Sequence, residues 1–393
     1  MRVFNGPARR MARTYVTDSA AYSAMMSQSL RRKEAFWLDY ARERVSWIRE
    51  PQVALDASRA PFYKWFPDGE VNMCYNAVDR QVLHGRGVQT AIAYESHVGG
   101  RSREITYKEL LQQVEACAAG LRSLGVEKGD RVVIYMPMVP EAIVAMLACN
   151  RLGAIHSVVF GGFAPRELAA RIRDAQPKAI ITSTCGIEKA RVLPYLPMVY
   201  DAIDMLEEEP DVRRKLNHLI VHDRTEFADA EGYAEGQSRS AKGVERHDYE
   251  RLVANAMERK ESCDCVALNA NDPLYILYTS GTTGRPKGVL RDNTHVVGLQ
   301  WSMDHFMGMT PGETYWCASD IGWTVGHSYT VFGPLLQGCT TLLYEGKPVG
   351  TPDASSYWKL IEKHEVTALF TAPTAVRAIR QVSWGRGELS RST

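Results

Sequence analysis

The segment YTSGTTGRPKGVL, residues 278–290, combines glycines, hydroxylated residues and one lysine directly after an apolar run. Gly281, Gly284 and Gly288 allow the backbone to adopt positive φ angles and to approach a ligand closely. Backbone amides exposed in such a turn form a nest of hydrogen-bond donors that suits an anion. The segment therefore predicts a phosphate-binding loop at the end of a buried strand.

Side chains of the same loop would complete the phosphate site. The predicted phosphate ligands are Thr279, Ser280, Gly281, Thr282, Thr283, Gly284 and Lys287. Lys287 is also the candidate catalytic cation, since a charge beside a phosphate is worth about 4 kcal/mol near a protein surface. Pro286 and Gly288 flank this lysine, which distinguishes the loop from the GxxxxGK[ST] loop of common nucleotide hydrolases. A merely flexible, solvated loop would leave this combination of residues unexplained.

The composition indicates a globular protein with a sizeable core. The chain has 393 residues, of which 45% are hydrophobic and 24% charged, as is usual for a globular protein. The formal net charge of +1 gives no reason to expect nucleic acid or an anionic membrane as a partner. Eight cysteines in a chain of this length favour a reducing compartment. Cys263 and Cys265 have no second pair at ligand spacing, so no metal site is predicted.

Apolar runs alternate regularly with amphipathic segments. Thr106 and Glu109 have the spacing of a capping box at a helix start. Pro140 and Gly153 suit the first turn and the end of the next helix, and Pro165 starts a third. Strands are expected at RVVIYMP, AIHSVVF, PKAIITS, LYILYTS, TYWCAS, CTTLLYE and VTALFTAP. This order, with short connections, predicts an α/β fold with mainly parallel sheets and flanking helices.

Four segments are expected along the chain. Residues 1–30 form a leader, 31–95 an N-terminal layer, 96–381 the main domain and 382–393 an unrelated tail. The leader is rich in arginine and hydroxylated residues and poor in acids, which fits a transit peptide and equally an unstructured basic arm. The first alternative predicts the mitochondrial matrix and the second the cytoplasm. The polar segment 226–245 is predicted to be a surface loop.

The segment YTSGTTGRPKGV strongly resembles the signature loop of the adenylate-forming enzymes, which include acyl-CoA synthetases, peptide-synthetase adenylation domains and luciferases. Four further segments resemble acetyl- and propionyl-CoA synthetases: YNAVDR (75–80), FGGFAPRELAARI (160–172), SDIGWTVGHSY (319–329) and YEGKPVGTPD (344–353). The last of these, followed by ALFTAPTAVRAIR, is similar to the propionyl type. The resemblance covers about Arg32 to Gln381. It implies an acetyl-CoA-synthetase-type N-terminal segment followed by the large N-terminal, AMP-binding domain of the adenylate-forming fold.

The resemblance implies a two-step ligase reaction. A carboxylate attacks the α-phosphate of Mg²⁺-ATP, diphosphate leaves, and coenzyme A then displaces AMP from the acyl-adenylate. The implied ligands are ATP, Mg²⁺, coenzyme A and a small carboxylate such as propionate or acetate. Because a carboxylate is ionised at neutral pH, the first step needs charge neutralisation and correct placement rather than a general base.

Two further sites are implied by the same resemblance. Trp323, Thr324 and Val325 correspond to the acyl pocket, although Trp323 could also be an ordinary core aromatic residue. His327 is interpreted as structural, because the reaction requires no acid–base residue there. The implied coenzyme A contacts are Phe160, Gly161, Gly162, Phe163, Ala164 and Arg191. The first three lie at a strand end before a helix N-terminus, which favours anions.

The sequence departs from the family at two places. A second coenzyme A-binding arginine of the family falls on Glu188, with Lys189 beside it. The family also continues past ALFTAPTAVRAIR with a second adenine and magnesium motif, a hinge and a small domain that carries a catalytic lysine. A truncated, poorly active synthetase with an incomplete fold is therefore expected. The alternatives are adenylation of another carboxylate and a non-catalytic protein that binds nucleotide or coenzyme A.

Overall fold

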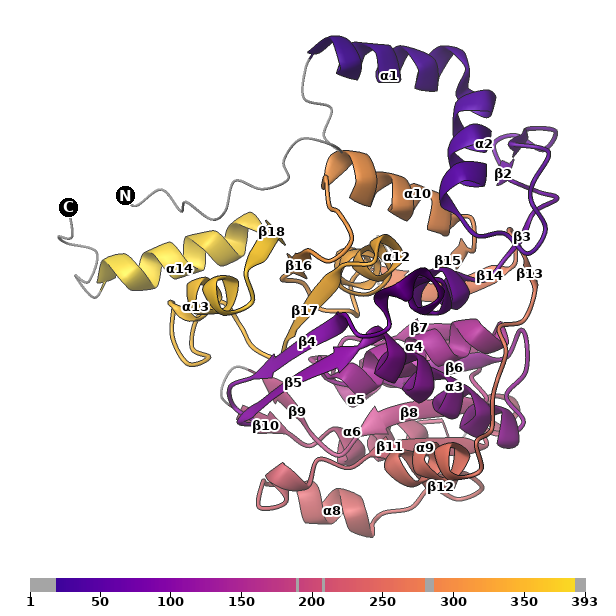
Figure 1. Cartoon of the computed structure of the whole chain (residues 1–393). Helices are drawn as coiled ribbons and strands as arrows, with labels where there is room; N and C mark the ends of the chain where they lie inside the picture. Colours follow the sequence, from indigo (N-terminus) through magenta and orange to yellow (C-terminus); the bar gives the residue numbers. More distant parts are fainter. Residues whose placement is uncertain (1–18, 189–190, 207–208, 280–285, 386–393) are drawn as a thin grey trace.

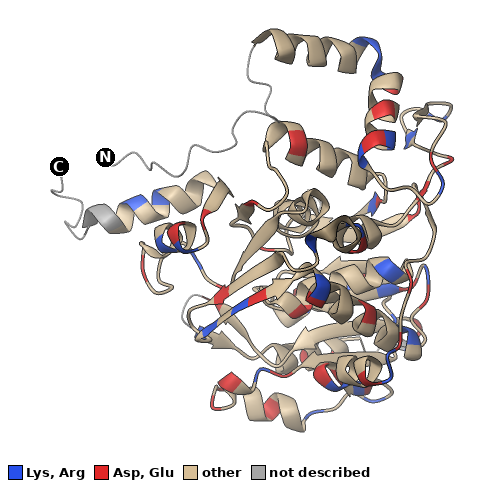
Figure 2. Cartoon of the chain, in the orientation of Figure 1, with Lys and Arg blue, Asp and Glu red and all other residues tan. Residues whose placement is uncertain are grey.

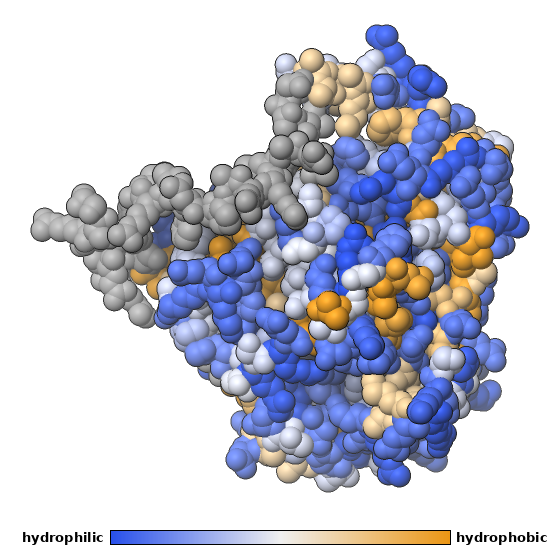
Figure 3. Space-filling view, in the orientation of Figure 1, coloured by the Kyte–Doolittle hydropathy of each residue, from blue (hydrophilic) through white to orange (hydrophobic). Residues whose placement is uncertain are grey.

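The computed structural model describes residues 19–188, 191–206, 209–279 and 286–385 (Figure 1). Two mixed sheets form the body of this part of the chain, and helices cover them. Lys and Arg are interspersed with Asp and Glu over the visible face (Figure 2), as the small net charge suggests. The same face is mostly hydrophilic, with small separated hydrophobic areas (Figure 3).

The larger sheet has the strand order β12-β11-β8-β6-β7-β14-β15. Its strands are β6 (Arg131–Tyr135), β7 (Ile155–Val158), β8 (Ala179–Ser183), β11 (His218–His222), β12 (Glu245–Asp248), β14 (Pro273–Thr279) and β15 (Lys287–Asp292). All neighbours pair in parallel except β14 and β15, which are antiparallel.

The smaller sheet has the order β18-β16-β17-β4-β5. Its strands are β4 (Thr90–Ser96), β5 (Arg101–Thr106), β16 (Thr314–Cys317), β17 (Thr340–Tyr344) and β18 (Val366–Phe370). Only β4 and β5 pair antiparallel. Three further antiparallel pairs are formed by β1 (Leu55–Asp56) with β2 (Lys64–Trp65), β3 (Glu70–Val71) with β13 (Leu268–Asn269), and β9 (Gly186–Glu188) with β10 (Arg191–Leu193). The prediction of an α/β fold with mainly parallel sheets is confirmed.

The α-helices are α1 (Ser19–Arg31), α2 (Lys33–Arg44), α3 (Tyr107–Ser123), α4 (Pro140–Leu152), α5 (Pro165–Ala175), α6 (Tyr195–Asp204), α7 (Pro210–Arg213), α8 (Tyr233–Ser238), α9 (Tyr249–Glu258), α10 (His295–Trp301), α11 (Thr324–Gly326), α12 (Gly333–Gln337), α13 (Ser356–Lys363) and α14 (Pro373–Gly385). Shorter or wider helical turns are η1 (Tyr75–Asp79), η2 (Val82–Arg86), η3 (Thr225–Phe227), η4 (Ser302–Phe306) and η5 (His327–Phe332). No helix within the described ranges is both long and apolar enough to cross a membrane.

Helices cover both faces of the larger sheet, and the side chains of β6 point alternately to the two faces. Val132 and Ile134 of β6 belong to one core cluster, together with residues of α3, α4 and α9. Val133 and Tyr135 belong to a second cluster, together with residues of α5 and α6. Successive side chains of a strand point to opposite faces, so one apolar strand supplies both cores.

The local signals for helix starts and ends are confirmed. The Glu109 amide donates to the Thr106 hydroxyl at 3.2 Å, and the Thr106 amide donates to the Glu109 carboxylate at 2.8 Å. This is the predicted capping box at the start of α3. Pro140 opens α4, and Gly153 ends it with a φ of 71°, a conformation that glycine adopts without strain.

Parts of three segments differ from the sequence-based expectation. Residues 226–245 were predicted to form a surface loop, but they contain helix α8 and the end of η3. The absence of a side chain at Gly236 lets α8 pack closely on α6, where a Cβ would lie 2.7 Å from Pro197. Helix α14 extends into the expected tail, and the exposed helix α1 lies within the expected leader and projects from the body (Figure 1).

Candidate functional site

The carboxyl ends of parallel strands from both sheets converge on one cavity of about 130 Å³. The segments that follow β6, β7 and β8 contribute Met138, Phe160 and Glu188 to its lining. The segments that follow β16 and β17 contribute Asp320 and Lys347. Ligands of open α/β sheets bind outside the carboxyl ends of the strands, so this cavity is the candidate site.

The predicted phosphate loop begins at the same edge of the larger sheet. Strand β14 is parallel to β7, so its end at Thr279 and the end of β7 face the same way. Thr279 pairs with Lys287 across the antiparallel strands β14 and β15, which brings these two predicted ligands together. Lys287 is exposed to solvent. The other predicted phosphate ligands, Ser280, Gly281, Thr282, Thr283 and Gly284, lie outside the described residues.

Residues predicted for the acyl pocket and for coenzyme A lie against one another. The ring of Trp323 has its centroid 5.6 Å from that of Phe160 and 6.2 Å from that of Phe163. Trp323 is 48% exposed, which excludes the alternative of an ordinary core aromatic residue. Thr324 and Val325 are exposed beside it. The two predicted sites therefore share an aromatic wall that faces solvent.

Glycine allows the backbones of the two sites to meet. A Cβ at Gly322 would lie 2.8 Å from the Phe160 backbone, and one at Gly326 would lie 2.0 Å from the Asp320 carbonyl oxygen. Neither position can hold a larger residue without movement of the backbone. The turn that carries Trp323 is thus held directly against the turn that carries Phe160.

A buried pair of histidines, His327 and His156, holds the turn that carries Trp323. His327 Nδ1 is 3.0 Å from the Ile321 carbonyl oxygen, and its Nε2 is 2.8 Å from Nε2 of His156 on β7. Since a carbonyl only accepts, His327 Nδ1 carries the proton and its Nε2 accepts from His156. The amide of Asn150, 3.2 Å away, then donates to His156 Nδ1.

Burial keeps both imidazoles of the pair neutral. It lowers the pKa of His327 to about 4 and the pKa of His156 well below its usual value, with the neighbouring ring as a second cause for His156. A neutral, fully hydrogen-bonded pair has no proton to offer a substrate at neutral pH. The arrangement agrees with the structural interpretation of His327, whereas His156 was not identified from the sequence.

Glu188, where the sequence departs from the family, forms an ion pair with a lysine from the segment after β17. Glu188 and Arg191 face each other across the β9–β10 pair, and Arg191 is exposed. The Glu188 carboxylate lies 3.1 Å from Lys347 Nζ, which also lies 5.6 Å from the centroid of the Phe160 ring. Lys347 therefore places a cation next to the predicted coenzyme A turn. Lys189 lies outside the described residues.

Asp320 adds a second carboxylate to the cavity. Loss of solvation raises the pKa of Asp320, although the Gly322 amide and the charge of Lys347 act in the opposite direction. The Gly322 amide donates to this carboxylate at 2.8 Å. The described lining thus combines the carboxylates of Glu188 and Asp320, the ammonium of Lys347 and the Phe160 ring, a polar and aromatic surface typical of a small-molecule site.

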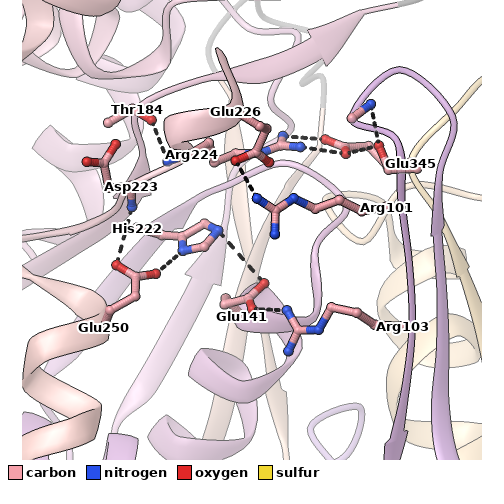
Figure 4. Close-up of polar contacts among 12 residues, drawn as sticks. Arg101, Arg103, Glu141, Thr184, His222, Asp223, Arg224, Glu226, Glu250 and Glu345 are labelled. Carbon is pink, nitrogen blue, oxygen red and sulfur yellow. Dashed lines mark hydrogen bonds and ion pairs between the residues drawn. The ribbon is translucent and has the colours of Figure 1, made fainter. Parts of the chain in front are cut away.

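The segment after β17 forms one wall of the cavity and is held by a buried ion pair (Figure 4). Arg224, after β11, donates to both carboxylate oxygens of Glu345 at 2.6 and 2.8 Å. The hydroxyls of Tyr94 and Ser96 each donate to the same carboxylate at 2.8 Å. Loss of solvation acts to lower the pKa of Arg224, but the charge and hydrogen bonds of Glu345, together with Tyr94 and Glu226, raise the pKa overall, so the guanidinium stays charged. The contact joins the two sheets two residues before Lys347.

Comparisons with known proteins agree with this geometry. Residues 79–390 match the family described as AMP-binding enzyme, and residues 22–77 match the acetyl-coenzyme A synthetase N-terminus. The mitochondrial acyl-CoA synthetase short-chain family member 3 of Bos taurus is 46% identical over 95% of this chain and 52% of its own length. The acetyl-coenzyme A synthetase of Cupriavidus metallidurans is 39% identical over 96% of this chain and 54% of its own length.

A solved structure gives the same fold. The acetoacetyl-CoA synthetase of Streptomyces lividans superposes with a TM-score of 0.78 at 24% identity, over 92% of this chain and 51% of that protein. The chain thus spans about half the length of the curated relatives that it matches.

Proposed function

The chain belongs to the AMP-binding enzyme family, and from this premise we propose that it acts in a short-chain acyl-CoA synthetase reaction. The proposed activity is that of an acid–thiol ligase, which converts a small carboxylate, ATP and coenzyme A into acyl-CoA, AMP and diphosphate. One observation carries the proposal. The predicted acyl and coenzyme A turns share a wall at the carboxyl edge of the sheet, where β14 leads into the predicted phosphate loop.

The first proposed step is adenylation. A carboxylate oxygen attacks the α-phosphate, the bond to the β-phosphate breaks, and diphosphate carries away the electron pair. Mg²⁺ enters with ATP as part of the substrate. The Lys287 ammonium and the glycine-rich turn would neutralise the charge that develops on the leaving diphosphate. In support, Lys287 pairs with Thr279 at the end of β14, and β14 runs parallel to β7, whose following segment lines the candidate cavity.

The second proposed step is thiol transfer. The coenzyme A thiol loses its proton to solvent as its sulfur bonds to the acyl carbonyl carbon, and the acyl–oxygen bond breaks with its electron pair leaving on AMP. Phe160, Phe163 and Trp323 would line the approach of the thiol, and Lys347 would attract a phosphate of the cofactor. Propionate or acetate as the acid, and a mitochondrial setting, belong to the same proposal. They are supported by the propionyl-type motif at 344–353, the arginine-rich start of the chain and the mitochondrial relatives.

Isotope exchange between diphosphate and ATP tests the adenylation step alone, since that step is reversible. We expect exchange that depends on propionate or acetate and that does not occur with amino acids. Isothermal titration with ATP and with coenzyme A supplies the comparison. Binding of both ligands without carboxylate-dependent exchange would replace the proposed ligase by a non-catalytic binding protein. Exchange with amino acids alone would assign a different acid.

Replacing Val325 by alanine should shift the acid preference towards longer chains. Val325 is 41% exposed at the predicted acyl pocket, so its truncation makes room for further methylene groups. Each accommodated methylene is worth about 1–3 kcal/mol, or roughly 10- to 200-fold in kcat/KM. The ratio of kcat/KM for butyrate to that for acetate measures the shift. Val88→Ala, at an exposed valine outside the predicted acyl and coenzyme A turns, is the control. An unchanged ratio in Val325→Ala would place the pocket elsewhere.

A further inference from the structure

Two strands at the edge of the larger sheet carry two histidines and a glutamate on one face. The parallel register pairs His218 of β11 with Glu245 of β12, and Ile220 with His247. Residues two apart on a strand point to the same side, so the three polar side chains project together. His218 Nδ1 lies 3.0 Å from His247 Nε2, and a Glu245 carboxylate oxygen lies 3.7 Å from the same nitrogen.

We propose that His218, Glu245 and His247 form a binding site for a zinc ion. One ligand atom from each residue lies within 4.8 Å of the others. In a tetrahedral site with Zn–N distances of about 2.0–2.1 Å, neighbouring ligand atoms are roughly 3.3 Å apart. The observed separations of 3.0 and 3.7 Å lie on either side of that value, so the ion needs only small side-chain shifts.

The chemistry of the three ligands also suits zinc. Imidazole nitrogens and a carboxylate oxygen are common zinc ligands, and three protein ligands leave a fourth position for water. Glu245 is exposed and His218 half-buried, so the ion can enter from solvent. The nearby ammonium of Lys178 is paired with Asp130 at 3.0 Å, which reduces its repulsion.

A second group of possible metal ligands surrounds the guanidinium of Arg151. Cys74, Asp79 and Cys265 also have ligand atoms within 4.8 Å of one another. Arg151 lies among them, with Nη1 2.8 Å from the Asp79 carboxylate and 3.1 Å from Cys265 Sγ. Because a buried guanidinium would repel a metal ion, the zinc site is assigned to the sheet edge.

Zinc at the sheet edge would cross-link β12 to β11. Strand β12 pairs through four residues only and has no neighbour on its other side in the described sheet. Edge strands are weakly held and can open or pair with other chains. Bound zinc would therefore stabilise this edge, independently of the proposed ligase activity.

Titration of the purified chain with Zn²⁺ against a chromophoric chelator tests the site. We expect one zinc ion per chain, its loss in His247→Ala, and at least tenfold weaker binding in Glu245→Gln. His97→Ala, at an exposed histidine away from the cluster, should bind as the unaltered chain does. Saturable binding that survives His247→Ala, that disappears in Cys265→Ser, or that is absent from the unaltered chain would overturn the proposal.

Two further measurements separate metal binding from misfolding. Thermal unfolding without zinc should be the same for His247→Ala and the unaltered chain, and zinc should raise the melting temperature of the unaltered chain only. Co²⁺ in place of Zn²⁺ should give visible bands without a thiolate charge-transfer band. Zinc-induced stabilisation of His247→Ala, or a thiolate band, would assign the metal to the cysteine group instead.

Discussion

Replacing Arg224 by alanine should lower the free energy of unfolding by about 3–5 kcal/mol, the usual cost of leaving one partner of a buried ion pair unpaired. The Arg224 and Glu345 side chains are 1% and 3% exposed, so the substitution leaves a buried carboxylate without its guanidinium partner. Among the described residues, only the hydroxyls of Tyr94 and Ser96 would remain as side-chain donors to the Glu345 carboxylate. Chemical denaturation, with the midpoint and slope both fitted, measures the change.

An exposed pair of the same chemistry provides the control. Arg173 donates to both carboxylate oxygens of Glu209 at 2.6 and 2.8 Å, yet these side chains are 45% and 34% exposed. Arg173→Ala should therefore cost less than about 1 kcal/mol. Equal losses at Arg224 and Arg173 would show that burial does not set the cost.

A second substitution separates lost pairing from lost packing. Adding Glu345→Gln to Arg224→Ala replaces a buried, unpaired carboxylate by a neutral amide, which costs less to bury. The double variant should then be more stable than Arg224→Ala alone. If it is not, the effect of Arg224 comes from its packing, for instance on the Phe227 ring 4.6 Å away, rather than from its charge.

The sheets were predictable from sequence because their signals are local. Runs such as RVVIYMP and LYILYTS are short, apolar and bounded by turn residues, as strands buried on both faces are. The capping box at Thr106 and Glu109 likewise lies within four residues. Helix α8 was missed because its polar, glycine-containing segment has no apolar helical period, and its close approach to α6 at Gly236 and Pro197 joins distant positions.

Contacts that shape the candidate site are mostly long-range, which explains what the sequence did not reveal. Arg224 and Glu345 are 121 positions apart, and His156 and His327 are 171 apart. No spacing pattern relates such pairs. Phe160 and Trp323 were predicted only through family resemblance, and their contact became visible in the structure. Lys347 had a usable signal, because GKP directly follows the predicted strand CTTLLYE and therefore lies at a carboxyl edge.

Replacing Lys287 by alanine should reduce diphosphate–ATP exchange at least tenfold, given the proposed function. Loss of one pre-positioned charge partner of a transition state typically costs a factor of about 10²–10³ in kcat. Lys287 is the first residue of β15 and pairs with Thr279 at the end of β14. The sheet therefore fixes the lysine backbone at the mouth of the predicted phosphate loop. Exchange rates at saturating and at limiting ATP measure the effect.

Comparison of the exchange rates at saturating and at limiting ATP shows whether Lys287 affects kcat or the KM for ATP. If the ammonium binds the transition state more tightly than it binds ATP, kcat falls and KM for ATP changes little. Lys287→Arg keeps the charge but changes its position and should recover only part of the rate. Lys108→Ala, on the exposed face of α3, removes one lysine without touching the carboxyl edge and should leave exchange unchanged. Equal rates for Lys287→Ala and Lys108→Ala would remove Lys287 from the mechanism and leave the charge of the leaving diphosphate to the backbone amides of the loop.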